Sequence, residues 1–387
     1  MSMNRLSLLI VLVLLISCSS DEEEVIEQTQ EIDYTAIEET FNGTIDPDNL
    51  FDYKGQAVPN YIRKDNSGNN PITNEGATLG RVLFYDKNLS IDNSISCSSC
   101  HQQSVAFGDS PLVSDGVAGV TGRHSMRLVN ARFSDEVKFF WDERATSLEN
   151  QTTQPIQDHV EMGFSGQNGD PDFNDLIEKL ESIDYYQELF HLAFGDSEIT
   201  EDRIQLALSQ FIRSIQSFDS KFDIGRVQVA NNDIEFPNFT ALENLGKQLF
   251  LDPPNMGGAG CGGCHRGAEF DIDPDSGNNG VIGVANSSEQ DITNTRAPSL
   301  RDLFNSNGEL NGLLMHDGSF STLLDVVNHY NEIPNSSAND NLDNRLMPRG
   351  NLQRLNLSEN DKEAIVAFVK TLSGTAIYTA EQWSNPF

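Results

Sequence analysis

The chain has 387 residues, a length that allows two or three domains, each with a core of its own. It carries 59 acidic against 25 basic residues, which gives a formal net charge of −34. Because binding to nucleic acid depends on clustered Lys and Arg, this balance excludes nucleic acid as an expected partner. A positively charged protein or a small neutral substrate fits the charge better.

Residues 1–18 are typical of an export signal. Arg5 supplies the positive start, and an apolar core of eleven residues, 6–16, is too short to span a bilayer, which takes about 20. The segment ends in Leu15-Ile16-Ser17-Cys18, which resembles a bacterial lipobox. A plain secretory signal with an incidental Cys is the alternative. We predict an exported outer-membrane lipoprotein, facing the periplasm or the cell surface and held to the membrane only by lipid on Cys18.

Residues 19–53 contain twelve Asp or Glu and no Lys or Arg. Such a segment buries little apolar surface and is strongly solvated. It is interpreted as an acidic tether between the anchor and the rest of the chain.

The four remaining cysteines fall in two copies of C-x-x-C-H, the attachment signature of c-type haem. Two thiols three residues apart can bond the two vinyl groups, while the adjacent His reaches the iron. A four-Cys zinc site or a thioredoxin-like pair would also use C-x-x-C. The 164-residue separation and the His in both copies favour two covalent haems, bound by Cys97, Cys100, His101, Cys261, Cys264 and His265.

Each motif follows a similar apolar segment, residues 79–86 and residues 245–252, at an offset of 166. Residues 141–148 and 316–323 are also alike, at an offset of 175. The repeats predict an internal duplication and an all-α fold of two tandem cytochrome c-type domains. We place the N-terminal domain at 54–230 and the C-terminal domain at 231–387.

The clearest secondary-structure signals are helical. Apolar residues recur every three or four positions in four segments, and no stretch alternates convincingly as a strand. We predict helices over 172–194, 201–218, 240–251 and 358–372.

A haem iron whose sixth position is filled by protein transfers electrons, whereas one with an open position can bind peroxide. At the offset of 175, Tyr330 in the second half corresponds to Pro155 in the first. A phenol can ligate iron and proline cannot, so we expect the second haem to be closed and the first open. An ordinary buried aromatic is the alternative interpretation of Tyr330.

The chain resembles the bacterial di-haem cytochrome c peroxidase family, which includes the MauG-type enzymes, over residues 72–375. Besides the haem motifs, the stretches that carry the resemblance are 140–144, 147–151, 155–156, 161–162, 295–301, 316–318 and 366–372.

The resemblance implies that the haems lie near the domain interface, that His101 is the proximal ligand of a peroxidatic haem in the N-terminal domain, and that His265 is the proximal ligand of an electron-transfer haem in the C-terminal domain. It also places Gln151 and Glu161 on the distal side of the first haem, where a carboxylate can move a proton between the oxygens of peroxide. Trp141 matches a tryptophan that lies between the haems and relays electrons. Taken alone, Glu161 reads as a solvent-facing acid and Trp141 as core packing.

Three positions depart from the peroxidases of the family. Where members that need reductive activation carry a distal His, this chain has Gly116, which predicts a first haem open at rest. Many peroxidases have Met at the position where this chain, like the MauG type, has Tyr330, and a phenolate ligand lowers the potential of the iron. His124 stands where an Asn side chain holds calcium, which argues against calcium although backbone carbonyls at 295–298 remain available.

Other candidate ligands have weaker support. Met315 and Met347 are alternatives to Tyr330 that do not fall at the matched position, and His329 is a further rival. His159 and His191 are interpreted as structural or surface residues.

Three alternative functions are consistent with these features of the sequence. The first is a cytochrome-c peroxidase that reduces hydrogen peroxide with electrons from a small basic cytochrome c or similar donor, a partner that the acidic body would attract. The second is a MauG-like oxidase acting on a protein or organic substrate. The third is a non-enzymatic multihaem electron-transfer lipoprotein, which would need six protein ligands at both irons.

Overall fold

The computed structural model describes residues 33–135, 138–270 and 276–387. The predicted export signal, Cys18 and residues 19–32 of the acidic segment lie outside the described residues. The prediction of a solvated tether is wrong for residues 33–53, because Ile37, Phe41 and Tyr53 of this part are buried in an apolar core. In the described part no helix is both long and apolar enough to cross a bilayer.

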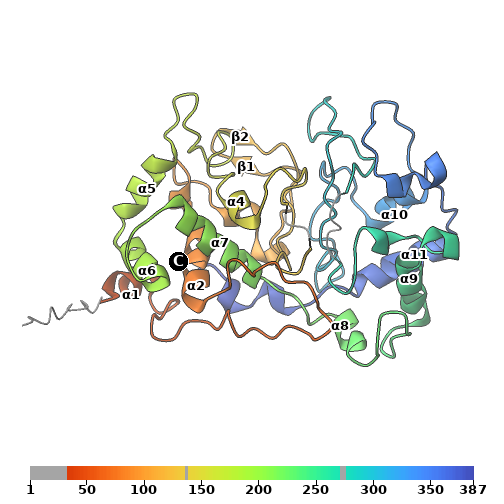
Figure 1. The fold of residues 1–387 in the computed structure, drawn as a ribbon, viewed down its shortest axis with the longest axis horizontal. Coiled ribbons are helices and arrows are strands. Elements are labelled where there is room, and N and C mark those ends of the chain that lie inside the picture. Colours follow the sequence, from red (N-terminus) through yellow and green to blue (C-terminus); the bar gives the residue numbers. More distant parts are fainter. Residues whose placement is uncertain (1–32, 136–137, 271–275) are drawn as a thin grey trace, which may run out of the picture. The chain divides into compact units, whose positions relative to one another are not determined.

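The described residues form eleven α-helices and a single pair of two-residue strands, so the predicted helical class is confirmed (Figure 1). The strands β1 (Asp115–Gly116) and β2 (Gly119–Val120) pair antiparallel. The helices are α1 (Thr35–Phe41), α2 (Asn74–Tyr85), α3 (Cys97–Cys100), α4 (Leu148–Thr152), α5 (Phe173–Glu181), α6 (Asp184–Phe194), α7 (Glu201–Ser214), α8 (Lys221–Arg226), α9 (Ala241–Leu251), α10 (Leu323–Asn331) and α11 (Glu359–Lys370).

Two predicted helices, 240–251 and 358–372, are confirmed as α9 and α11, each capped by a hydroxyl. The prediction of one helix over 172–194 is wrong, because it is broken at Ser182 into α5 and α6. The Ser182 hydroxyl donates to the Lys179 carbonyl at 2.6 Å, and Ile183 is extended. The helix predicted to reach residue 218 ends at Ser214, since the extended Ile215 gives its carbonyl to the Asn130 N–H.

A close helix crossing recurs in both halves. α2 packs on α7, and α9 packs on α11. A Cβ at Gly80 would overlap the Ala207 carbonyl, and a Cβ at Gly246 would overlap the Ala364 carbonyl. Glycine is therefore required at each crossing, because only its missing side chain lets the two backbones approach this closely.

A second recurring feature precedes α4 and α10. Single antiparallel bridges join Phe139 to Ala145 and Leu314 to Phe320, at the offset of 175 predicted from the sequence. Phe140 and Met315 in these loops have φ of 69° and 71°. The two loops thus share a backbone conformation that residues other than glycine rarely adopt.

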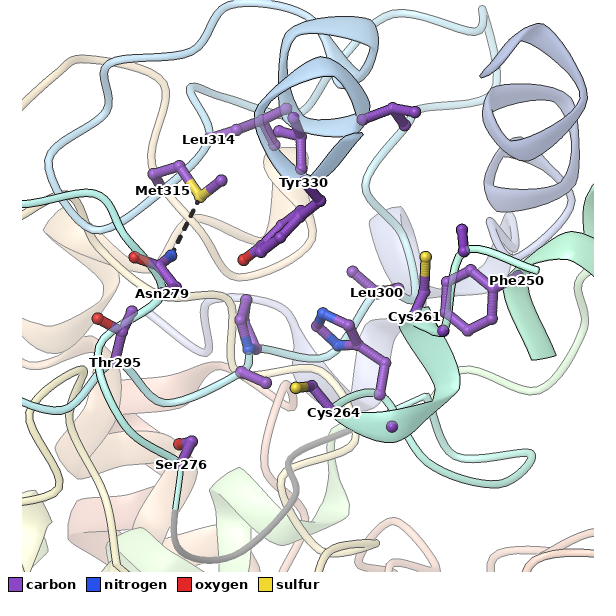
Figure 2. A pocket seen from close by; sticks show the side chains of 18 of the residues that line it. Phe250, Cys261, Cys264, Ser276, Asn279, Thr295, Leu300, Leu314, Met315 and Tyr330 are labelled. Carbon is purple, nitrogen blue, oxygen red and sulfur yellow. Dashed lines mark hydrogen bonds between the residues drawn. The ribbon is translucent and has the colours of Figure 1, made fainter. Parts of the chain in front are cut away.

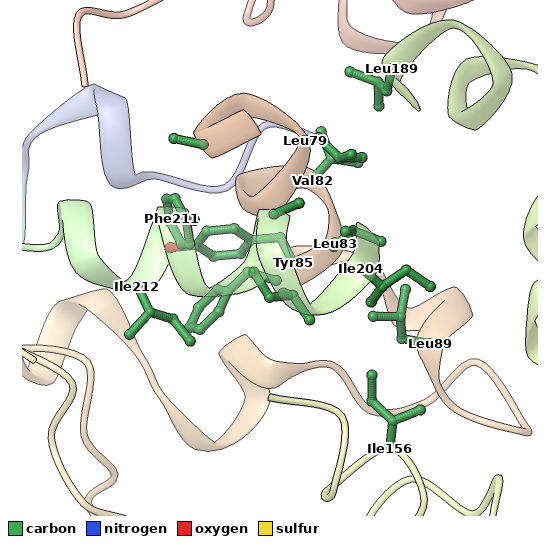
Figure 3. Close-up of a cluster of buried hydrophobic side chains, with 14 of the residues drawn as sticks. Leu79, Val82, Leu83, Tyr85, Leu89, Ile156, Leu189, Ile204, Phe211 and Ile212 are labelled. Atoms are coloured by element: carbon green, nitrogen blue, oxygen red, sulfur yellow. The ribbon is translucent and has the colours of Figure 1, made fainter. Parts of the chain in front are cut away.

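The apolar core has two main clusters, one in each half. In the first, side chains of α2 and α7 such as Leu83 and Phe211 interdigitate (Figure 3). The second surrounds Phe250 of α9 and Phe368 of α11, whose ring centroids lie 5.3 Å apart. The last residues of the chain return to the first cluster, where the Tyr85 hydroxyl donates to the Trp383 carbonyl at 2.6 Å.

Candidate haem centres

The first C-x-x-C-H motif lies in the wall of a cavity of about 740 Å³. Its cysteines begin and end α3, whose start is held by a reciprocal hydrogen-bonded cap between Ser96 and Ser99. The Nδ1 atom of His101 lies 3.2 Å from the Phe107 carbonyl, which leaves Nε2 available to a metal. Burial lowers the pKa of His101, so the imidazole is neutral, as a ligand must be.

The second motif lines a separate cavity of about 560 Å³. Arg345 donates to the Gly263 carbonyl at 3.2 Å and so fixes the loop between the two cysteines. Burial lowers the pKa of His265 to about 4, against the opposing effect of the Pro298 carbonyl. Each cavity is of the size that cofactors occupy and presents two thiols and one neutral imidazole. These donors fit a covalently attached haem.

The alternative metal sites do not fit this arrangement. The two cysteine pairs line different cavities, so they cannot share one zinc ion. A thioredoxin-like pair needs a βαβ unit, and the described residues form no strand longer than two residues.

The structure places Gln151, Pro155 and Glu161 together in the lining of the first cavity. Gln151 lies on α4, and the other two follow in the next turns of the chain. His124 and His316 also line this cavity, but their rings face the carbonyls of Pro111 at 3.0 Å and Gly283 at 3.1 Å. The residue at the matched ligand position, Pro155, has no side-chain atom that can bind a metal.

Glu161 is held from two sides by backbone contacts. The N–H groups of Val160 and Glu161 donate to Oδ1 of Asp158, at 2.8 and 3.0 Å. The N–H groups of Val117 and Ala118, in the β1–β2 hairpin, donate to the carbonyls of Glu161 and Val160 at 3.1 and 3.2 Å. The acid therefore sits on a segment with little freedom to move.

Gly116 makes the hairpin contact feasible. A Cβ at this position would overlap the Val160 carbonyl and lie 2.9 Å from the Glu161 Cα. A histidine cannot occupy residue 116 unless the hairpin leaves the Glu161 segment. Sequence reasoning singled out Gly116 only for the side chain it lacks; the packing against Glu161 is a finding of the structure.

The partly buried Glu161 carboxyl is poised to exchange protons near neutral pH. Its pKa is raised to about 7, chiefly by burial and in addition by the nearby Asp158, while Arg144 acts in the opposite direction. All three residues line the first cavity. A carboxyl with this pKa can both take up and return a proton.

The two cavities share one wall, to which Trp141 belongs. Its Nε1 donates to the His124 carbonyl at 2.7 Å, and its carbonyl accepts from the Arg296 N–H at 2.8 Å. The indole is therefore fixed between the cavities. The residues that line both are His124, Ser125, Met126, Arg127, Trp141 and Arg296.

Sequence reasoning did not single out the arginines of this wall. Arg127 lines both cavities and donates to the Ser299 carbonyl at 3.3 Å, and burial lowers its pKa to about 10. Arg296 is 4% exposed and lies over the Phe139 ring, at 4.4 Å from its centroid. The signal for Arg296 was the stretch 295–301; nothing in the sequence sets Arg127 apart from other surface cations.

The second cavity has a potential ligand where the first has Pro155. Tyr330 reaches from α10 into the space above Cys264, with Met315 and Asn279 beside it (Figure 2). Burial raises the pKa of the Tyr330 phenol well above its usual range. Asn279 donates to the Met315 sulfur at 3.5 Å. Met347, which the structure also describes, does not line this cavity.

The remaining histidines lie away from both cavity linings. The His329 ring faces the Asn279 carbonyl at 2.9 Å, and the exposed His159 contacts Asp170 at 2.6 Å. His191 lies on α6. Within the described ranges no three His, Cys, Asp or Glu side chains gather as a further metal site.

Comparison with known proteins relates the chain to one family. The model of a di-haem cytochrome c peroxidase family matches residues 74–228. The methylamine utilization protein MauG of Methylophilus methylotrophus is 30% identical over 322 residues, covering 80% of this chain and 85% of that protein. The cytochrome c551 peroxidase of Nitrosomonas europaea is 30% identical over 321 residues, covering 79% and 81%.

Solved structures show the same fold. A MauG-like protein associated with microbial copper homeostasis superposes with a TM-score of 0.68 at 27% identity, covering 86% of this chain and 99% of its own. The di-haem peroxidase BthA of Burkholderia thailandensis, as a Y463M variant, gives a TM-score of 0.62 at 21% identity, covering 86% and 96%.

Proposed function

Because the chain belongs to the di-haem cytochrome c peroxidase and MauG family and binds two c-type haems, we propose that it reduces hydrogen peroxide in the first cavity. Electrons arrive through the second cavity. The difference between the matched positions Pro155 and Tyr330 carries the proposal, since a phenol can fill the ligand position in the second cavity whereas the proline side chain cannot fill it in the first.

The haems supply the electron storage and the iron coordination that the reaction needs. Glu161 accepts a proton from the near oxygen of peroxide and returns it to the far oxygen, which leaves as water. Gln151 orients the peroxide by hydrogen bonding. Two electrons and two protons in total convert one peroxide into two waters.

The route for electrons crosses the shared wall. Trp141 lines both cavities and is fixed by two backbone hydrogen bonds, so its ring offers a rigid relay. The donor is a small basic cytochrome c or a similar carrier attracted by the acidic body. Turnover with such a donor should fall as salt rises, and a salt-independent rate would count against it.

A MauG-like oxidase is the second candidate, and Tyr330 favours it. A phenolate stabilises ferric iron, lowers the potential of the second haem and makes transfer from an ordinary cytochrome c less favourable. In this case the haems that the two cavities hold would store oxidising equivalents, and electrons would be withdrawn from a protein or organic substrate at the surface.

The matched helix crossings and matched loops support an internal duplication, with domains at 54–230 and 231–387 and the haems near their interface. Export and lipid attachment at Cys18 rest on the sequence alone. Labelling of the expressed protein with radioactive palmitate, compared with Cys18→Ser, tests the anchor.

Stopped-flow mixing of the holoprotein with peroxide tests the function. We expect peroxide to be consumed and reduced cytochrome c to be oxidised at two equivalents per peroxide. A peroxide-generated species that persists in the presence of reduced cytochrome c would contradict the peroxidase and support the oxidase.

A further inference from the structure

Two adjacent tyrosines at the start of α6 share one buried carboxylate. The hydroxyls of Tyr185 and Tyr186 both donate to Oδ2 of Asp86, each at 2.7 Å. Asp86 follows the last residue of α2 and is 5% exposed. The centroids of the two phenol rings lie 4.8 Å apart. No role in the proposed reaction accounts for this group.

The pair leads from the first haem motif toward the surface. Tyr186 is completely buried in the first core cluster, against which Cys97 packs. Tyr185 is partly exposed and lies edge-on to Phe41, at 5.5 Å between centroids. The two phenols thus lead from the core that packs against the first haem motif to a partly exposed ring.

We infer that Tyr186, Asp86 and Tyr185 form a proton-coupled exit for oxidising equivalents, at which a small phenolic reductant is oxidised near Tyr185. The inference rests on the proposed peroxide chemistry, which supplies the oxidant. It gives the molecule a second outlet when the protein donor is scarce.

The electron and proton balance closes at each step. Tyr186 gives one electron to the oxidised first centre, and its phenol proton passes to Asp86, which leaves a neutral tyrosyl radical. Tyr185 then gives an electron to Tyr186, Asp86 returns the proton to Tyr186, and Asp86 takes the Tyr185 proton. The Tyr185 radical accepts one electron from a phenol in solution and regains its proton from Asp86, while the phenol releases its own proton to solvent.

The carboxylate distinguishes this pair from the neighbouring tyrosines. Tyr85 adjoins the cavity wall more directly, since its ring centroid lies 5.2 Å from that of Phe84, a lining residue. Its hydroxyl, however, donates to the backbone carbonyl of Trp383, which is too weak a base to take a proton. Tyr85 therefore serves as the matched control.

The alternative is a purely structural role, in which the hydrogen bonds from Tyr185 and Tyr186 to Asp86 only hold α6 against the end of α2. The two roles differ in a spectroscopic signature. Holoprotein is mixed with peroxide in the absence of a donor, frozen within milliseconds and measured by EPR. We expect a tyrosyl radical signal that is lost in Tyr186→Phe and in Asp86→Asn, and that persists in Tyr85→Phe. An unchanged signal in the first two variants would overturn the inference.

Two further measurements, the first on the wild-type chain and the second on Tyr185→Phe, keep the test decisive where Tyr186→Phe or Asp86→Asn fails to fold. A nitroso spin trap followed by peptide mass mapping should place the adduct on Tyr185, and an adduct confined to other residues would overturn the exit. Oxidation of p-cresol by peroxide should be lost in Tyr185→Phe, while oxidation of reduced cytochrome c is unchanged. If peroxide is consumed with cytochrome c but no radical forms at Tyr185 or Tyr186, the exit alone fails; if peroxide is not consumed, both proposals fail.

Discussion

The first and second cavities are built from the same backbone features and differ in a few side chains that face the cofactor. Each has a C-x-x-C-H wall, a helix crossing that requires glycine, and a bridged loop before a capped helix. At the matched ligand position the first has Pro155 and the second has Tyr330. The first also has Glu161, an acid on a segment that the β1–β2 hairpin clamps. The function of each half therefore depends on a few positions, and substitutions at these positions test the difference between the two cavities.

The largest effect is expected from making the first cavity like the second. Pro155→Tyr offers a phenol at the matched position and should abolish peroxide reduction, because the open position is filled. The number of cyanide molecules bound per protein should fall from one to none in Pro155→Tyr, and should rise from one to two in Tyr330→Phe, which removes the phenol from the second cavity. Titration monitored by absorption measures both. One cyanide bound in wild type and in both variants would contradict the assignment.

The second-largest effect is expected from removing the Glu161 carboxylate. Glu161→Gln retains the shape of the side chain but cannot shuttle a proton, so the bimolecular rate with peroxide should fall by about 10²–10⁴-fold. Glu178→Gln, on the exposed face of α5, is the control and should leave the rate unchanged. Stopped-flow kinetics at pH 8 gives both rates, and equal rates would remove Glu161 from the reaction.

A smaller effect is expected from loosening the clamp. Gly116→Ala forces the hairpin away from Val160 and shifts Glu161, which should slow the reaction with peroxide by about tenfold to a hundredfold. Gly122→Ala is the matched control, because a Cβ there meets no atom within 4 Å. A Gly116→Ala protein as fast as Gly122→Ala would show that the clamp does not position the acid.

The smallest effect is a displacement of the pH profile. Since the carboxylate must be ionised to accept a proton, the rate should rise with pH through a midpoint near the Glu161 pKa of about 7. Asp158→Asn removes a negative charge, lowers the pKa and moves the midpoint to lower pH, while it keeps an oxygen for both N–H groups. Arg144→Gln removes a positive charge and moves the midpoint to higher pH. Shifts in the same direction would contradict this account.

The sequence predicted what local pattern and motif spacing encode. α9 and α11 follow from apolar periodicity, and both haem motifs from cysteine spacing. The break at Ser182 was missed because the apolar pattern continues across it: Leu180 and Tyr186 are both buried in the same core. Gln151, Glu161 and Trp141 came from the family resemblance, since their residue types alone suggest surface or core.

Features that depend on tertiary packing could not be predicted. The Gly116 hairpin contacts a segment about 45 residues further along the chain, and no local signal marks that pairing. Asp86 meets Tyr185 and Tyr186 across a sequence separation of 99 and 100 residues. An aspartate after a helix and two aromatics on another helix are each unremarkable until the fold brings them together.

EPR of the resting ferric holoprotein tests the difference between the cavities most directly. The account predicts one high-spin signal from the first cavity, whose ligand position is empty of protein, and one low-spin signal that changes in Tyr330→Phe. Two low-spin signals would contradict an open first site, and two high-spin signals would contradict ligation by Tyr330.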